Sequence, residues 1–467
     1  MIALASSTNP SASGCFSRGW VFLAAAVFIS LVVAEYQGPI IGIAVSVTAI
    51  GVAILCSAGL PVPKFPGAAV WLVGILILGL GSAVLADVRG QTSLDVDVQR
   101  DLGISLSYLL YLSVGCYFSY SRHTLRLLLI AVVAAGLLIS VVHLVRLSEV
   151  LSSGATDLYL FRLEAGRGSV TQFAALCSTL VLLRDSAKTT HRTLIIGSAT
   201  VLVMSMLMTL SRGLMFLLII LVVGATGLTV GQRNRLSVNV PRLLITVAAA
   251  MAAAASIYVL TRICLPVAHL FIDEYFITRL ANSVTEVSGT KLETRTQIAD
   301  SYRAFELNRA MVQFEAQPAY AQWIGQGWGS HVNFGFETAS TRSTFSRTGA
   351  AFLHNGYAYF LMKTGIVGLV LYLGFMLHAL ARAASRNTWP TTPSALTRRK
   401  LLLVVATGLA VGTVTTGGLG FPATYLGLVL ILGACYGPAW NAEANPEISK
   451  PQPEAVMTLR RKRFESV

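Results

Sequence analysis

Residues 127–145 read LLLIAVVAAGLLISVVHLV, an uninterrupted run without an Asp, Glu, Lys or Arg. An α-helix of ~17–25 apolar residues is long enough to cross the ~30 Å hydrocarbon core of a bilayer. The run therefore predicts a membrane-spanning helix. It decides the fold class because similar runs recur along most of the chain.

Working outward from that run, we predict about twelve spans separated by polar breaks. They lie near 19–36, 39–60, 67–86, 102–120, 127–145, 169–183, 193–210, 214–230, 243–260, 355–381, 401–419 and 421–438. The first run is not a cleavable signal peptide, because its basic leader is weak and further spans follow directly.

The composition agrees with a membrane protein. Of the 467 residues, 54% are hydrophobic and only 12% are charged, with a mean hydropathy of +0.68; soluble domains average ~25% charged residues. The sequence thus predicts an all-α integral membrane protein. It excludes a soluble metabolic enzyme, a disordered scaffold and a disulfide-stapled secreted domain.

Basic residues predict the orientation. With the N-terminus in the cytoplasm, the inner side receives 20 Lys and Arg but only 5 Asp and Glu, whereas the rest of the chain holds 15 and 16. Cytoplasmic loops of membrane proteins carry such an excess of positive charge. We therefore expect both termini in the cytoplasm. The net charge of +14 has the same origin, so no nucleic-acid partner is predicted.

Four regions follow from this topology. Residues 1–260 hold spans one to nine, 261–352 form a long extracytoplasmic loop, 353–440 hold spans ten to twelve, and 441–467 are a cytoplasmic tail. A loop of about 90 residues in a compact bundle is usually functional. Its stretch 291–315 is compatible with a helix. The sequence Ile324-Gly325-Gln326-Gly327-Trp328-Gly329 predicts a sharp turn that brings the loop back to the membrane.

Arg212 stands in Leu210-Ser211-Arg212-Gly213, between two apolar runs with no room for a loop. The plain interpretation is an arginine that snorkels to the outer interface. The functional one is a guanidinium held at the outer face, where its fork of donors suits the oxygens of a phosphate.

His354 opens the tenth span in Phe352-Leu353-His354-Asn355-Gly356-Tyr357. A lone histidine at such a place is often a structural hydrogen-bonding group. However, this one directly follows the long loop and should lie at the depth of Arg212. Histidine is well suited to accept a proton near neutral pH, so we predict that His354 is catalytic.

Further arginines are expected on the same side of the membrane. Arg162 and Arg167 lie in a glycine-containing loop between the fifth and sixth spans, and the long loop adds Arg295, Arg303 and Arg309. Together they predict a cationic cleft above the bilayer that suits an anionic, lipid-linked substrate. The sequence has no nucleotide-binding motif, no HExxH and no acidic metal cluster in its spans, so neither cofactor nor metal is predicted.

In its order of motifs, the chain resembles the O-antigen ligase and polymerase superfamily of bacterial envelope glycan assembly. Over roughly 155–375, the resemblance rests on an Arg-Gly loop ending in Gln172-Phe173-Ala174, then Leu210-Ser211-Arg212-Gly213, then Arg303 with the glycine turn 324–329, then His354-Asn355-Gly356-Tyr357 with Gly365 and Gly368. Two departures are the turn Arg167-Gly168-Ser169-Val170-Thr171 and Lys363, which has no assigned role.

The resemblance implies a metal-independent, inverting glycosyltransferase of the GT-C type in the bacterial inner membrane. Its donor would be a polyprenyl-diphosphate-linked oligosaccharide, and its acceptor lipid A–core in lipopolysaccharide biosynthesis or another lipid-linked glycan in O-antigen or exopolysaccharide polymerisation. The implied catalytic residues are His354 and Arg212. The expected substrate-binding residues are Arg162, Arg167, Arg295, Arg303, Asn355 and Tyr357.

Two other functions stay open from the sequence. A polysaccharide or lipid transporter would be expected to show repeated halves and helices broken at the midplane. A structural or sensory scaffold would leave the grouping of arginines and a histidine at the outer face unexplained. Ligase and polymerase share all the motifs above, so the sequence does not separate them.

Overall fold

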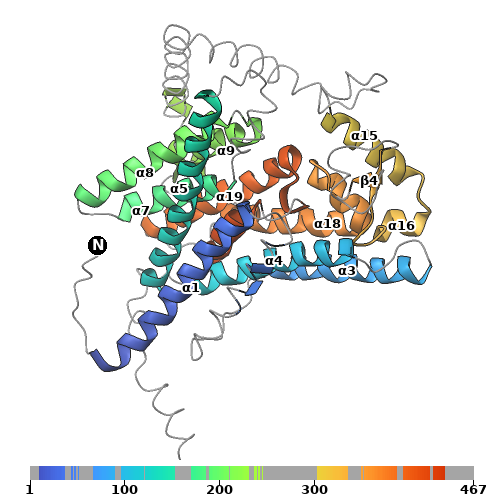
Figure 1. Cartoon of the computed structure of the whole chain (residues 1–467), viewed down its shortest axis with the longest axis horizontal. Coiled ribbons are helices and arrows are strands. Elements are labelled where there is room, and N and C mark those ends of the chain that lie inside the picture. The colour runs from blue at the N-terminus through green and yellow to red at the C-terminus, as the bar shows by residue number, and fades with distance from the viewer. Residues whose placement is uncertain are drawn as a thin grey trace, which may run out of the picture.

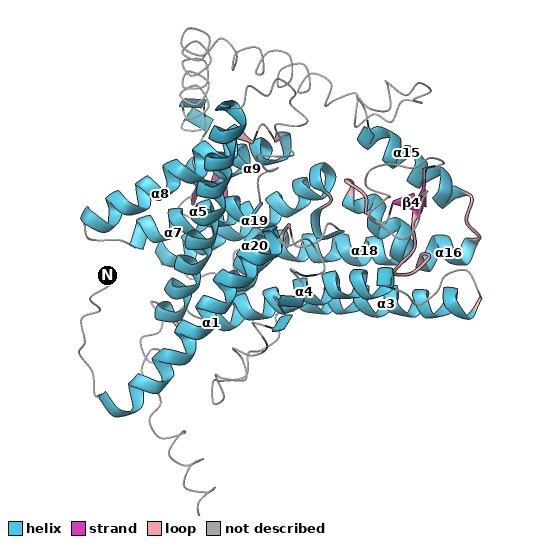
Figure 2. Ribbon diagram, viewed as in Figure 1, coloured by secondary structure: helices cyan, strands magenta, loops and turns pink. Residues whose placement is uncertain are grey.

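The computed structural model describes residues 10–36, 67–89, 96–119, 121–152, 170–185, 189–209, 211–230, 236–238, 302–334, 349–350, 352–385, 393–420 and 424–436, with scattered positions in 41–51 and 240–245. These residues are mostly helical (Figure 2). Their helices are α1 (Pro10–Tyr36), α3 (Ala69–Val88), α4 (Val96–Phe118), α5 (Arg122–Ser152), α7 (Val170–Asp185), α8 (Thr189–Met208), α9 (Arg212–Val222), α15 (Tyr302–Glu315), α16 (Ala319–Ile324), α18 (Gly356–Ala384), α19 (Pro393–Thr416) and α20 (Leu426–Tyr436).

The remaining described elements are short. A π-helical turn η1 (Val223–Gly227) and a 3-10 turn η3 (Gly418–Gly420) follow α9 and α19, respectively. Two antiparallel pairs join β1 (Leu228–Val230) to β2 (Leu236–Val238) and β3 (Val332–Asn333) to β4 (Gly349–Ala350).

Six of the described helices are long and apolar enough to cross a membrane. They are Gly19–Tyr36, Ala69–Val88, Asp97–Phe118, Arg122–Val150, Thr189–Met208 and Gly356–Ala384, and three shorter apolar helices cover Val170–Arg184, Gly213–Ala225 and Leu426–Tyr436. The prediction of a mostly helical membrane protein is confirmed. The full set of twelve spans stays a prediction, since 39–60 and 243–260 lie mostly outside the described residues, as does most of the loop 261–352.

The centre of the bundle is α20, in which all eleven residues are buried. It crosses α4 at two glycines. A Cβ on Gly115 would strike the Leu430 carbonyl, and one on Gly433 would strike the Leu112 carbonyl. Small residues at such a crossing let two helix backbones approach closely, which is how membrane helices gain packing without a hydrophobic driving force.

A buried polar cluster ties α5, α7 and α8 together. The Gln172 amide Nε2 donates to the Ser205 hydroxyl at 2.7 Å and to the Ser140 hydroxyl at 3.0 Å, and His143 Nδ1 lies 3.0 Å from Ser205 Oγ. Hydrogen bonds of this kind between membrane helices contribute about 0.6–2 kcal/mol each. Gln172, one of the residues on which the family resemblance rests, thus has a packing role.

Helices α3, α4 and α18 lie side by side, and α15 and α16 lie at one end of them (Figure 1). The glycine turn after α16 descends between α3 and α18. The Trp328 backbone N–H donates to the Gly79 carbonyl, and its indole N–H points to the Leu76 carbonyl at 3.4 Å. Leu76 is about 18 Å along the helix axis from the end of α3 at Val88. The turn thus packs against helices of the bundle, whereas the position of the loop outside the membrane stays a prediction.

Helix α18 is broken where the glycine turn packs against it. Gly365 has φ 65° and ψ −167°, a conformation open essentially only to glycine. The break interrupts the helical hydrogen bonding of the preceding carbonyls. Those of Met362 and Lys363 accept instead from the backbone N–H groups of Gln326, at 3.1 Å, and Gly327, at 2.9 Å. Non-helical backbone is thereby satisfied inside the bundle.

One sequence prediction was wrong. The predicted bounds of the third and fourth spans, 67–86 and 102–120, place Asp97 and Asp101 in the loop between them, but α4 begins at Val96 and both carboxylates are buried, at 2% and 0% exposure. The reason is charge pairing, because each carboxylate meets a basic side chain and the helix continues through them.

The predicted topology can be tested at two exposed positions that are expected on opposite sides of the membrane. Ala316 is exposed at the end of α15, whereas Thr190 is exposed at the start of α8 on the predicted inner side. In a cysteine-free background, we expect Ala316→Cys to react with an impermeant maleimide in intact cells and Thr190→Cys to react only after permeabilisation. The reverse pattern would overturn the orientation.

Candidate functional site

His354 lies just before α18 and is paired with a carboxylate of α15. Its imidazole Nδ1 is 2.9 Å from Glu306 Oε2, and its backbone N–H donates to the same oxygen at 3.0 Å. The Glu306 side chain is 4% exposed, while the His354 side chain is 32% exposed. The carboxylate is thus a buried anchor, and the imidazole that it holds remains accessible.

This pairing orients the ring. With a proton on Nδ1 donated to Glu306, a neutral imidazole presents its lone pair at Nε2. A carboxylate behind a histidine also stabilises the imidazolium that forms when Nε2 takes up a proton, as in hydrolytic triads. The geometry is therefore that of a general base with its orienting partner.

The Glu306 carboxylate lies on one continuous face of helix α15. Arg303, Glu306, Ala310 and Gln313 follow each other at three- and four-residue spacing, so they share one side of the helix. Glu306 and Ala310 are buried, and Arg303 is half-buried one turn before Glu306. The Tyr302 ring packs edge-on against the His354 ring, with centroids 6.1 Å apart. The outer helix is thus held over the start of α18.

Asn355 and Tyr357 have structural contacts here. The Asn355 side-chain oxygen caps α18 by accepting from the backbone N–H groups of Tyr357, at 3.0 Å, and Ala358, at 3.2 Å. The Tyr357 hydroxyl donates to the Ala410 carbonyl at 3.2 Å. These bonds fix the turn that carries His354. Contact of Asn355 or Tyr357 with a substrate stays a prediction.

The backbone of Arg212 lies at the same end of the bundle. Arg212 is the first residue of α9, five residues before Leu217, which lies against Gly408 of α19. By helix geometry, Arg212 is then level with about Thr413. Thr413 in turn borders Gly356 at the start of α18. The predicted common depth of Arg212 and His354 agrees with this packing.

Of the other predicted arginines, only Arg303 and Arg309 lie in the described residues. Arg162, Arg167 and Arg295 lie outside the described residues. Arg309 is exposed, with its guanidinium carbon 5.5 Å from the Phe305 ring centroid. Of the predicted site, the structure therefore places His354, Asn355, Tyr357 and Arg303 around one junction of α15 and α18.

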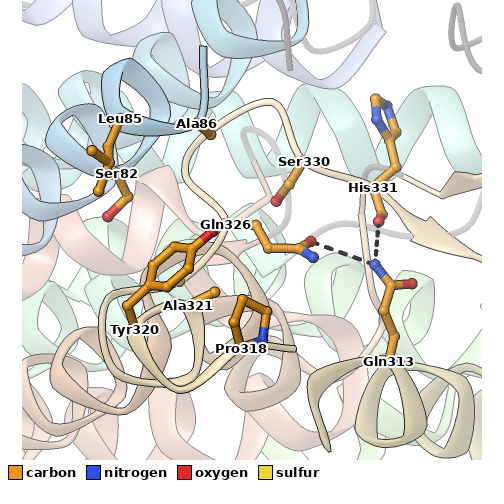
Figure 3. Close-up of a pocket in the computed structure, with 11 residues that line it drawn as sticks. Ser82, Leu85, Ala86, Gln313, Pro318, Tyr320, Ala321, Gln326, Ser330 and His331 are labelled. Atoms are coloured by element: carbon orange, nitrogen blue, oxygen red, sulfur yellow. Dashed lines mark hydrogen bonds between the residues drawn. The ribbon is translucent and has the colours of Figure 1, made fainter. Parts of the chain in front are cut away.

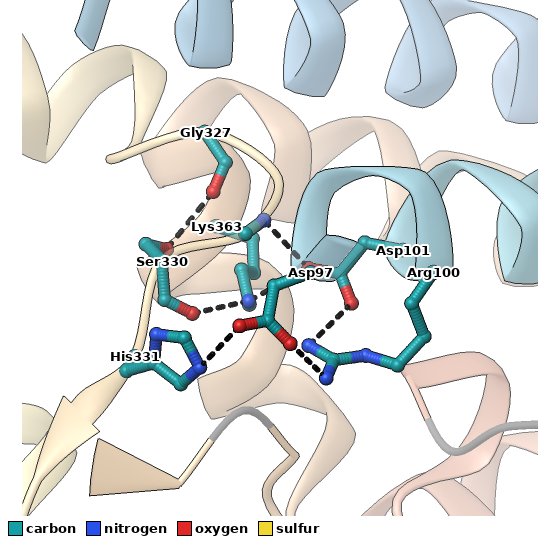
Figure 4. Close-up of polar contacts among 8 residues, drawn as sticks. Asp97, Arg100, Asp101, Gly327, Ser330, His331 and Lys363 are labelled. Carbon is teal, nitrogen blue, oxygen red and sulfur yellow. Dashed lines mark hydrogen bonds and ion pairs between the residues drawn. The ribbon is translucent and has the colours of Figure 1, made fainter. Parts of the chain in front are cut away.

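Beneath this junction lies a buried cluster of charged side chains (Figure 4). The Lys363 ammonium donates to Asp101 Oδ2 at 2.7 Å and to the Ser330 carbonyl. Asp101 Oδ2 also accepts from the backbone N–H of Gly329 at 2.8 Å. Arg100 bridges Asp97 and Asp101, with Asp97 Oδ2 lying 3.1 Å from His331 Nε2. Two acidic and two basic groups thus balance one another.

The cluster fixes the glycine turn that follows α16 to the bundle. Asp101 comes from α4, Lys363 from α18, and Gly329 and Ser330 from the loop, so one carboxylate joins three parts of the chain. Arg100 also lies 4.4 Å from the centroid of the Phe352 ring, two residues before His354. The position of the turn that carries His354 therefore depends on this cluster, which gives Lys363 a structural role.

Two of these residue sets carry a signal in the sequence itself. Lys363 lies in an apolar span, and a buried ammonium requires an anionic partner. Asp97, Arg100 and Asp101 stand at the spacing of one helix face, which would have extended the fourth span. Glu306 was included in a helix-compatible stretch, but nothing local indicated that it pairs with His354, 48 residues later.

The pairing of His354 with a buried carboxylate is an arrangement that suits proton transfer. In the described part of the chain, no group of three or more His, Cys, Asp or Glu is placed to hold a metal ion. No known protein-family model matches the sequence, and no curated protein matches it.

Proposed function

We propose that the protein is a membrane glycosyltransferase of the O-antigen ligase and polymerase type. It would transfer a polyprenyl-diphosphate-linked glycan to lipid A–core or to another lipid-linked glycan, at the outer face of the bacterial inner membrane. The observation that carries the proposal is the pairing of His354 Nδ1 with the buried Glu306 carboxylate at 2.9 Å. That pairing gives an accessible base at the end of a membrane bundle.

In the proposed reaction, an acceptor hydroxyl oxygen attacks the anomeric carbon of the donor sugar. The bond from that carbon to the diphosphate oxygen breaks, and the hydroxyl proton passes to Nε2 of His354. The polyprenyl diphosphate leaves with its negative charge. Glu306 stabilises the imidazolium formed, in the manner of a carboxylate–histidine pair.

Positive groups at the same level would stabilise the leaving group. Arg212 begins α9 at this end of the bundle, and Arg303 lies one turn from Glu306 on α15. One guanidinium group can bind two phosphate oxygens at once through two parallel N–H···O hydrogen bonds. Because a diphosphate is already a good leaving group, positioning and charge stabilisation can supply most of the acceleration.

The direct test is transfer by the purified protein. A polyprenyl-diphosphate oligosaccharide would be supplied with lipid A–core in one reaction and with a second lipid-linked glycan in another. Glycan joined to lipid A–core identifies a ligase, and a lengthened lipid-linked glycan identifies a polymerase. Absence of both products, with the protein folded and the donor intact, would contradict the proposal.

Arg212 supplies a sharper prediction. If its guanidinium holds two phosphate oxygens, Arg212→Lys should lose most transfer activity although the charge is kept, because an ammonium cannot form the two-pronged contact. The rate of transfer at saturating donor measures this. Arg192→Lys, at an exposed position of α8 on the predicted inner side, is the matched control. Near-normal rates in Arg212→Lys would leave Arg212 as an interfacial anchor.

A further inference from the structure

A pocket of about 350 Å³ lies among α3, α15 and α16, and His354 is not among the residues that line it. Figure 3 shows the lining residues. The pocket is walled by the end of α3, the end of α15, helix α16 and the glycine turn. It is at the small end of the ~300–1,000 Å³ that ligand sites occupy. Since the turn is bonded to both α3 and α18, the walls belong to one packed unit.

The polar lining of the pocket comprises two amides, hydroxyl groups and one imidazole, which faces a buried carboxylate. Gln326 reaches across it toward Gln313, whose Nε2 donates to Gln326 Oε1 at 3.4 Å and to the His331 carbonyl at 3.0 Å (Figure 3). In that bond Gln326 is the acceptor, and its own Nε2 donates to no residue in the described ranges. The Ser330 hydroxyl donates to the Gly327 carbonyl, so its oxygen keeps acceptor capacity. Unused donor and acceptor capacity therefore meets in the pocket.

The rest of the lining limits the chemistry of an occupant. No Asp, Glu, Lys or Arg is among the lining residues. The basic groups in or beside the lining are already engaged, because His331 Nε2 lies 3.1 Å from Asp97 and the Arg89 guanidinium lies 3.9 Å from the Tyr320 ring centroid. A phosphate or carboxylate would have to compete for these groups. A purely apolar chain would cover the Gln326 amide without bonding it, which costs free energy. The aromatic ring of Tyr320 and the apolar side chains of Leu85, Ala86 and Pro318 complete the wall. A neutral ligand with hydroxyl groups and C–H faces fits both parts.

We propose that this pocket binds a neutral saccharide unit of the glycan that the protein transfers. The inference rests on the proposed function, since a glycan transferase must hold its substrate chain. Gln313 lies on the face of α15 that also carries Glu306, about 10 Å further along the helix. One helix therefore carries both the partner of the base and a wall of the saccharide site, and a glycan lying along α15 reaches both.

The test uses photocrosslinking of the purified full-length protein. A benzophenone amino acid replaces Tyr320 in the pocket or, as the control, Trp323, which is exposed on the same helix and does not line the pocket. Three probes are supplied: the polyprenyl-diphosphate oligosaccharide, the same oligosaccharide released from its lipid, and sugar-free polyprenyl diphosphate. We expect adducts at position 320 with both sugar-containing probes, and background yields at position 323 or with the sugar-free lipid.

A second pair of variants tests whether the Gln326 amide contributes to oligosaccharide binding. Gln326→Leu should weaken binding of the released oligosaccharide about 3- to 10-fold by removal of one hydrogen bond. Gln322→Leu should not, because Gln322 bonds the carbonyls of Glu315 and Gln317 outside the pocket. Equal adducts with sugar-free lipid, or no excess over position 323, would overturn the saccharide site. Retained transfer would then leave the proposed function standing, whereas adducts without any transfer would refute that function and keep the site.

Discussion

Replacement of His354 by alanine is expected to lower the rate of glycan transfer by about 10²–10⁴-fold, the usual contribution of a general base. Donor binding should survive, since the imidazole is proposed to act on the acceptor hydroxyl. The fold should also survive, because the His354 side chain is one-third exposed and the cap of α18 comes from Asn355. Single-turnover transfer, with donor binding measured separately, checks both points.

Glu306→Gln separates a positioning role from a purely structural one. The amide keeps the size of the side chain and can still accept from the His354 backbone, but it lacks the charge that stabilises imidazolium. The rate of transfer should therefore fall. Glu315→Gln, at an exposed position of the same helix, is the control. Wild-type transfer rates in His354→Ala would contradict the role of His354 as a base.

Breaking the ion pair between Asp101 and Lys363 should have the largest effect on stability. Either Asp101→Asn or Lys363→Met leaves an uncompensated charge in a buried cluster, at a cost of about 3–5 kcal/mol. Because the Asp101 carboxylate also accepts from the Gly329 backbone N–H, removal of its charge weakens that hydrogen bond and should loosen the glycine turn. The apparent unfolding midpoint of the detergent-solubilised protein measures the first effect, and protease sensitivity of the loop measures the second.

The double variant distinguishes pairing from simple packing. With both charges removed, the cluster retains Arg100 and Asp97, so most of the lost stability should return. Asp87→Asn, at the half-buried end of α3, makes the same chemical change outside the cluster and should cost under 1 kcal/mol. A double variant as unstable as the sum of the single ones would show that the two charges do not act as a pair.

The parts of the fold that the sequence predicted are those with a local signal. Apolar runs located the spans, and Asn355-Gly356 after a polar loop located the start of α18. Hydropathy failed at the start of α4, because it treats Asp97 and Asp101 as exposed charges. Their burial becomes favourable only through Arg100 and Lys363, and the latter is distant in the chain.

The candidate site was predicted in part for the same reason. His354 was identified because it is a titratable group at a span entrance. Its partner Glu306 was not, since the pairing requires α15 to fold back over α18, and that depends on tertiary contacts. The glycine turn was predicted from its composition. Its landing place between α3 and α18 was not, because backbone hydrogen bonds to Met362 and Lys363 carry no side-chain pattern.

The broken helix α18 has a consequence for how the protein is made. Two of its carbonyl groups are satisfied by amides of residues 326 and 327, and an unsatisfied carbonyl in hydrocarbon costs several kcal/mol. This span therefore cannot settle in lipid by itself. Its partner segment is synthesised first, so under the predicted topology it has already been exported when α18 leaves the translocon. A variant in which the segment containing Gln326 and Gly327 is deleted before α18 would leave two carbonyl groups of this helix without hydrogen bonds. Quality-control proteases would then be expected to degrade it as an unassembled span.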